Sequence, residues 1–176
     1  MGIIKIALHK MNLQFYLEKL TNSEEFREFK IEFPEAYLCS AFFIIDKERK
    51  DNKIHFDFFV PEGKKIISFQ MENGIKKEEL ENLNSEVQEK ISQAQDVDFN
   101  EIESMISKRM EKNGISNKIQ KIILSIQNYK GREILSGTVF ISMMGMIKIQ
   151  IDLKKKEIIE FEKKSFMDIL NIVKKK

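Results

Sequence analysis

Residues 134–147 read ILSGTVFISMMGMI, a run without a charged side chain in a chain of 176 residues that is 33% charged. A transmembrane helix needs about 20 apolar residues, so this run is too short to cross a bilayer as a helix. Gly137 and Gly145 interrupt it, and the β-branched and aromatic residues of Thr138–Ile141 favour a strand. Because Met143–Gly145 falls where the chain should turn, the run predicts a buried β-hairpin.

Three methionines gather at this predicted turn, namely Met143, Met144 and Met146. Unbranched thioether side chains repack easily around different partners, so these residues could form an adaptable binding surface. Filling of the protein core beside a turn is the simpler interpretation, and it is the one that we expect.

The alternation of apolar and polar residues that marks a half-buried strand continues on both sides of this hairpin. In KIHFDFFV (residues 53–60) one face of the predicted strand carries Ile54, Phe56, Phe58 and Val60. Short polar loops such as KERKDN separate the runs, which is typical of an antiparallel meander. The pattern predicts strands over residues 36–46, 53–60, 64–71, 121–127, 132–142, 146–153 and 157–164.

Apolar residues spaced three and four apart predict helices between these runs. The predicted helices cover residues 11–33 in two pieces, 76–95, 98–112, and a short C-terminal segment that begins at Ser165. Ser23 and Asp98 are suited to cap helices, because their side-chain oxygens can accept a hydrogen bond from a backbone N–H. The helix over 76–95 has a narrow apolar stripe with acidic flanks.

The order helix, strand, strand, strand therefore occurs twice. We predict an α+β fold of two helix-plus-antiparallel-meander units, with the helices packed on antiparallel sheet and a short C-terminal helix. The units are residues 1–73 and 98–176, joined by an acidic connecting helix over 74–97, and they could form one compact domain. An offset of eighty residues aligns several apolar positions, such as Ile54 with Ile134, and suggests an internal repeat. This element order resembles the helix-then-meander modules of the cystatin-like kind, a resemblance that rests on no motif.

Composition indicates a folded protein of the cytoplasm. The hydrophobic fraction of 42% and fourteen Phe exclude an intrinsically disordered chain. The single cysteine, Cys39, excludes a fold stapled by internal disulfides. The first residues, MGIIKIALHK, have neither a basic n-region nor a small-residue cleavage site, so we expect no signal peptide.

The sequence predicts no catalytic, cofactor-binding or metal-binding residues. The two histidines are His9 and His55, and a dyad of Cys39 with His55 is not expected, because the predicted hairpin keeps them apart. His55 and Asp57 share one strand face and could share a ligand, but a solvated polar face explains them equally well. Zinc-binding spacings and phosphate-binding glycine loops are absent from the sequence.

Charge is distributed unevenly along the chain. Residues 72–111 carry eleven acidic and five basic side chains, whereas residues 112–176 carry fourteen basic and six acidic ones. A basic end can bind a polyanion. The candidates for this role are Lys154, Lys155, Lys156, Lys163 and Lys164.

We therefore expect a non-catalytic intracellular binding or assembly module whose partner is a protein or a second copy of this chain, without membrane insertion. Edge strands of an open sheet favour pairing with a second copy. A heptad-like stripe offers another dimer seam, formed by Leu80, Leu83, Val87 and Ala94. The alternatives are a protein that binds nucleic acid or the ribosome through its basic C-terminal third, and an enzyme whose site is not visible in the sequence.

Overall fold

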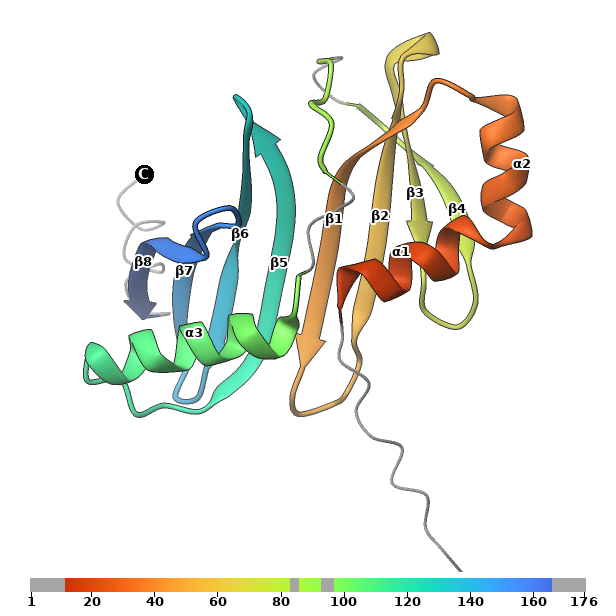
Figure 1. The fold of residues 1–176 in the computed structure, drawn as a ribbon. Coiled ribbons are helices and arrows are strands. Elements are labelled where there is room, and N and C mark those ends of the chain that lie inside the picture. Colours follow the sequence, from red (N-terminus) through yellow and green to blue (C-terminus); the bar gives the residue numbers. More distant parts are fainter. Residues whose placement is uncertain (1–11, 83–85, 93–96, 166–176) are drawn as a thin grey trace, which may run out of the picture.

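The structure, a computed structural model, describes residues 12–82, 86–92 and 97–165. Eight strands form one antiparallel sheet in the order β4-β3-β2-β1-β5-β6-β7-β8 (Figure 1). The strands are β1 (Tyr37–Asp46), β2 (Lys53–Val60), β3 (Lys65–Gln70), β4 (Lys76–Leu80), β5 (Ile119–Tyr129), β6 (Arg132–Ile141), β7 (Gly145–Asp152) and β8 (Glu157–Ser165). The helices are α1 (Leu13–Thr21), α2 (Glu24–Glu32) and α3 (Phe99–Lys112), and the 3₁₀ turn η1 (Glu62–Lys64) precedes β3.

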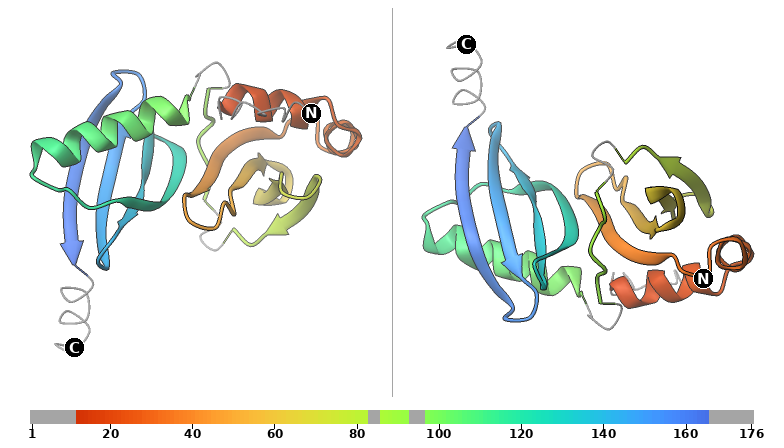
Figure 2. Two further views of the ribbon diagram at one scale, coloured as in Figure 1. Left: turned by 90° about the horizontal axis from the view of Figure 1, so that it is seen from below. Right: turned by 90° about the horizontal axis from the view of Figure 1, so that it is seen from above.

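The two halves of the sheet meet at its middle, where β1 pairs with β5, from Ser40 opposite Gln127 to Asp46 opposite Lys121. We call residues 12–80 the N-terminal half and residues 97–165 the C-terminal half. Away from this seam, each half continues as a meander of consecutive strands. Figure 2 shows the halves side by side, with α1 and α2 over the N-terminal half and α3 across the C-terminal half.

The helices pack on one face of the sheet, which we call the inner face. The ring of Phe26 in α2 lies 5.1 Å from that of Phe58 in β2, and the ring of Phe99 in α3 lies 4.7 Å from that of Phe43 in β1. Because side chains alternate along a strand, every second residue of each strand points to this face. The buried side chains here include Phe43, Phe56, Phe69, Leu124, Val139 and Ile147.

The helix ends follow the predicted capping signals. Ser23 Oγ accepts a hydrogen bond from the backbone N–H of Phe26 at 3.2 Å, and Asp98 Oδ1 accepts one from Asn100 at 2.8 Å. The chain leaves α3 through Gly114, whose φ of 68° suits glycine. The helices predicted over residues 11–33, in two pieces, and over 98–112 are thereby confirmed where the structure describes them, as α1, α2 and α3.

The predicted hairpin at residues 134–147 is also confirmed, because β6 pairs with β7 from Ile134 opposite Asp152 to Ile141 opposite Gly145. The expected role of its methionines is wrong for two of them. Met143 and Met144 form the turn and are exposed, so they do not fill the core.

The predicted fold class is wrong. The strands form one large eight-stranded antiparallel sheet, which dominates the fold more than the predicted arrangement of two helix-plus-meander units would: 47% of the described residues are strand and 24% are helix. The acidic connecting helix over residues 74–97 is not formed in the residues described there: Lys76–Leu80 is strand β4, paired with β3, and residues 86–92 are not helical. The predicted C-terminal helix after Ser165 lies outside the described residues.

The sheet register agrees with the eighty-residue offset between β3 and β7, where Ile67 and the aligned Ile147 both lie on the inner face, but not between β1 and β5. The offset aligns Phe43 with Ile123, but Phe43 pairs with Leu124 and therefore shares a face with Leu124. Ile123 is the neighbour of Leu124 in the same strand, so it points to the opposite face. Between these two strands the offset thus matched residues from different sides of the sheet.

Residues 86–92, which we call the strap, run beside the ends of β1 and β5. The backbone N–H of Ile91 donates to Leu38 O at 2.9 Å, and the Tyr37 hydroxyl donates to Gln88 O at 2.8 Å. Phe59 lies on the outer face, away from the helices, yet it is only 1% exposed, and its ring packs 5.6 Å from that of Tyr37. Tyr37 thus joins the strap to Phe59 on the outer face, whereas Ile91 of the strap belongs to the core beneath the helices.

Candidate functional site

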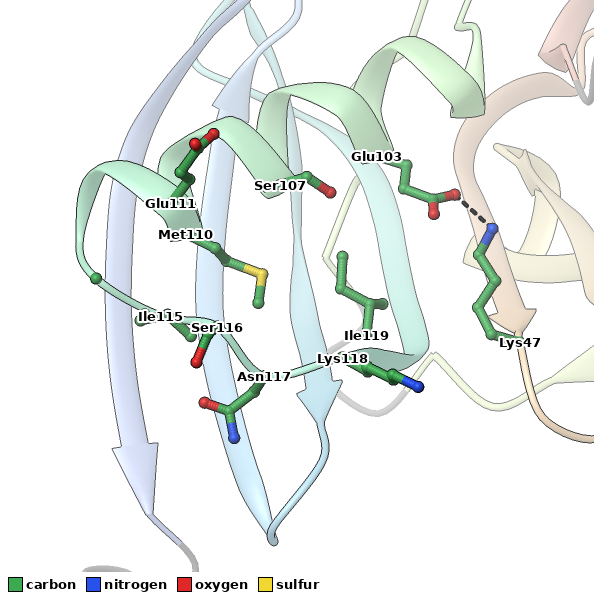
Figure 3. Close-up of a pocket in the computed structure, with 11 residues that line it drawn as sticks. Lys47, Glu103, Ser107, Met110, Glu111, Ile115, Ser116, Asn117, Lys118 and Ile119 are labelled. Atoms are coloured by element: carbon green, nitrogen blue, oxygen red, sulfur yellow. Dashed lines mark ion pairs between the residues drawn. The ribbon is translucent and has the colours of Figure 1, made fainter.

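A groove of about 690 Å³ lies between α3 and the segment 114–118, which we call the connector (Figure 3). The side chains of Met110 and Ile119 point into it, and Ile115 lines it from the connector, so that it has an apolar floor. Met110 and Ile115 are among the core residues, so the groove opens directly onto the hydrophobic core.

The connector is held close to the helix by local hydrogen bonds. The backbone N–H of Ile115 donates to Met110 O at 2.9 Å, which folds the chain back under the end of α3. Further along, the amide Nδ2 of Asn117 donates to Ser142 O at 2.9 Å and ties the connector to the β6–β7 turn. The walls of the groove are therefore fixed at both ends of the connector.

One end of the groove is bounded by an ion pair between Lys47, just after β1, and Glu103 of α3, with Nζ and Oε2 2.5 Å apart (Figure 3). Both side chains are partly exposed, so the pair contributes little to stability. Its position matters more, because it joins the two halves beside the groove. On the connector, the backbone N–H groups of Ser116 and Asn117 make no hydrogen bond within the described chain.

The thiol of Cys39 is not a reactive nucleophile. Burial raises the pKa of this thiol to about 12, and the nearby Asp57 carboxylate adds to the effect. The thiol Sγ donates to Asp57 O at 3.3 Å, within the bulge of β1. A protonated, buried thiol is unreactive.

His55 and Asp57 lie on the outer face of β2, as their alternation predicted, but they do not converge on one site. His55 Nε2 lies 2.7 Å from Glu72 Oε1. Burial raises the pKa of Asp57, while hydrogen bonds from Ser68 and Ser40 act in the opposite direction. The described residues contain no cluster of three or more acidic, histidine or cysteine side chains placed to hold a metal ion.

The predicted polyanion-binding lysines are not brought together. Lys154, Lys155 and Lys156 lie around the β7–β8 turn, whereas Lys163 and Lys164 lie at the other end of β8, roughly 23 Å away at the usual rise per residue. Lys155 pairs with Glu157, Lys156 with Glu101, and Lys164 with Glu162. Lys156 instead adjoins three cations of α3, namely Lys108, Arg109 and Lys112, around a cleft of about 280 Å³.

The predicted dimer seam lacks the helix on which it depends. Leu80 ends strand β4, and Val87 lies in the strap and is exposed. Leu83 and Ala94 lie outside the described residues. The two described residues of the heptad-like pattern, Leu80 and Val87, therefore do not lie on a helix.

Sequence patterns gave no indication of the groove. Met110 lies on the buried face of α3 with Ile102 and Ile106, but no local pattern indicates that a groove lies beside this face. Lys47 and Glu103 are far apart in sequence, and only the pairing of β1 with β5 brings them together.

No protein-family model and no curated protein matches the chain. Its fold is similar to that of a "putative lipoprotein" from Clostridium difficile 630 whose crystal structure has been determined. The TM-score is 0.52 and the sequence identity 10%, over 80% of this chain and 90% of that one. At this identity the likeness shows the fold alone. Within the described residues, no helix has the length and apolar character needed to cross a membrane.

Proposed function

We propose that this protein is a non-catalytic binding module of the cytoplasm, and that its groove between α3 and the connector binds an extended apolar segment of a partner protein. The observation that carries this proposal is the apolar floor of the groove, formed by the partly exposed Ile119 beside the buried Met110 and Ile115. A volume of about 690 Å³ falls within the usual range of ligand sites. The single cysteine, buried and protonated, is compatible with a reducing compartment.

A peptide fits this groove better than a small molecule because of the connector. The backbone N–H groups of Ser116 and Asn117 have no partner in the described chain, and a carbonyl oxygen of an extended peptide is the kind of acceptor that such a group needs. Apolar side chains of the same peptide would then cover the floor. The ion pair of Lys47 with Glu103 limits the groove at one end.

A second copy of this chain suits the sheet edges poorly. The exposed edge strand β4 reads KKEEL, and β8 carries Glu160, Glu162, Lys163 and Lys164. Charged side chains on edge strands oppose pairing with another sheet. We therefore favour a different protein as the partner, and light scattering of the purified chain tests the choice.

The groove is tested by panning a library of random short peptides against the full chain. Enriched peptides should carry apolar residues, and Ser107→Trp, which fills the groove from α3, should weaken their binding at least tenfold. Ser104→Trp is the matched control, because Ser104 is exposed on the same helix and does not line the groove. Failure to enrich any peptide, or equal binding to folded Ser107→Trp, would overturn the proposal.

Nucleic-acid binding is the second candidate, and the cleft formed by Lys108, Arg109, Lys112 and Lys156 favours it. If it is correct, affinity for RNA should fall steeply with added salt, and Lys108→Gln with Lys112→Gln should reduce both affinity and salt dependence. Salt-independent or absent binding removes this candidate.

A further inference from the structure

The turn between β6 and β7 differs from the other turns of the described chain. Met143 and Met144 have φ angles of 63° and 58°, a left-handed conformation that large side chains rarely adopt. The other described residues with positive φ, glycines apart, are polar: Lys50, Lys64, Asn73, Lys130 and Lys156. This turn is the one that places two large apolar residues in that conformation.

Both methionines extend into solvent, with exposed fractions of 90% for Met143 and 69% for Met144. The turn is held firmly, because the backbone N–H of Ser142 donates to Lys118 O at 2.8 Å. Holding two apolar side chains away from the core in a strained backbone contributes nothing to folding. The pair is therefore suited to contact something outside the molecule.

Positive charge lies beside these methionines. Lys118 adjoins the turn through its bonds with Ser142, and Lys163 and Lys164 lie opposite Ile147 and Met146 at the end of β8. Lys164 pairs with Glu162 at 3.3 Å. Lys118 and Lys163 form no ion pair within the described residues, so their charges are available.

We propose that the β6–β7 turn binds the surface of an anionic lipid bilayer, with Met143 and Met144 entering the interfacial region and Lys118 and Lys163 contacting the headgroups. A stable protein interface buries about 1,200 Å² or more, which a narrow convex turn does not provide. Membrane binding needs no such area, because apolar burial and attraction to anionic lipids add up group by group.

The test is co-sedimentation of the full chain with vesicles of phosphatidylglycerol and phosphatidylcholine, compared with phosphatidylcholine alone. Met143→Asn with Met144→Gly is the decisive variant. Asn and Gly adopt the left-handed conformation of these two positions more readily than Met does, so this variant keeps or improves the fold while it removes the apolar surface. Its partition coefficient should fall about tenfold or more.

Two further variants complete the test. Ile31→Asn removes an apolar side chain that is 82% exposed on α2, away from the turn, and should leave binding unchanged. Lys118→Gln with Lys163→Gln should weaken binding to anionic vesicles and reduce its salt dependence. Ser107→Trp should not affect it, which separates this inference from the peptide-binding proposal. No binding of the wild-type chain, equal binding to phosphatidylcholine alone, or undiminished binding of the folded Asn-Gly variant would overturn the inference.

Discussion

The core of the N-terminal half is aromatic, whereas that of the C-terminal half is aliphatic. In the first, rings from α2 and the strands are in mutual contact: Phe26, Phe29, Phe33, Phe58 and Phe69. In the second, α3 covers Leu124, Leu135, Val139, Ile147 and Ile149. The same sheet is therefore packed by large interlocking rings at one end and by branched side chains at the other.

The surfaces of the two halves also differ, in how far apolar residues are exposed on them. In the N-terminal half even Phe59, on the outer face, is buried, and the neighbouring Tyr37 bonds to the strap. In the C-terminal half, a groove lies next to the core residues Met110 and Ile115, and a turn holds Met143 and Met144 in solvent. This contrast suggests that the N-terminal half chiefly stabilises the sheet and that the C-terminal half makes the external contacts.

The largest expected effect comes from the aromatic core. Phe29 is fully buried and its ring lies within 6 Å of four other rings, so Phe29→Ala should lower the free energy of unfolding by about 3–5 kcal/mol. Ile106 is equally buried in α3, but Ile106→Ala removes fewer atoms and no ring contacts, so its loss should be the smaller one. Urea denaturation measures both.

Ile31→Ala, on the exposed side of α2, is the control for Phe29→Ala and should change stability by less than about 0.5 kcal/mol. Both core variants should shift one common transition, because β1 and β5 join the halves in one sheet. A greater loss for Ile106→Ala than for Phe29→Ala would contradict the contrast between the cores.

An intermediate effect is expected at the strands next to the seam. In the N-terminal half, Phe43 of β1 faces Ile54 of β2, whereas in the C-terminal half Leu124 of β5 faces Gly137 of β6. A Cβ at Gly137 would overlap the carbonyl oxygen of Ile123 and lie 2.8 Å from Leu124 Cδ2. Gly137→Ala should therefore destabilise the protein by about 1–3 kcal/mol in urea denaturation.

Ser136→Ala is the neighbouring control for this position, because Ser136 lies on the outer face and its substitution adds no atoms. A stability of Gly137→Ala equal to that of Ser136→Ala would mean that β5 and β6 can separate slightly without cost. The C-terminal half would then be more plastic than its close strand packing indicates.

Elements with local signals were predictable from the sequence. The alternation in KIHFDFFV located β2 at its observed bounds, and Ser23 and Asp98 marked the starts of α2 and α3. At Ser23 and Asp98 the deciding interaction joins residues close in sequence. In β2 the burial of one strand face leaves an alternation of apolar and polar residues in the sequence. Such signals do not depend on the rest of the fold.

The failures have a common cause, which is contact between distant segments. The Glu- and Lys-rich residues 76–95 suit a helix locally, but Lys76–Leu80 pairs with β3 along its whole length, and the backbone N–H of Ile91 donates to Leu38 O at the start of β1. The union of the halves depends on pairing between β1 and β5, and the groove depends on a connector tied to Ser142. Periodicity within one segment carries no information on any of these partners.

The smallest expected effect concerns the outer face of the N-terminal half. Burial raises the pKa of Asp57 above its ordinary value of 3.8, and its Oδ1 has no hydrogen-bond partner within the described structure. The folded state thus holds a proton more tightly at Asp57 than the unfolded state does. The contribution of Asp57 to stability therefore falls as the pH rises from that ordinary value through the raised pKa of the folded protein.

Asp57→Asn removes the buried charge, so it should raise the free energy of unfolding at pH 7 by about 1 kcal/mol. The difference in free energy of unfolding between Asp57→Asn and the wild type should shrink as the pH falls below 3.8, the ordinary pKa of Asp. The Asp57 carboxyl is then protonated in both the folded and the unfolded state. Urea denaturation at several pH values measures this, with the exposed Asp51→Asn as control. A destabilised Asp57→Asn would show instead that the ionised carboxylate is needed by Ser40 and Ser68. The outer face of the N-terminal half would then be a polar site that the fold maintains at a cost, and the division of roles between the two halves would not hold.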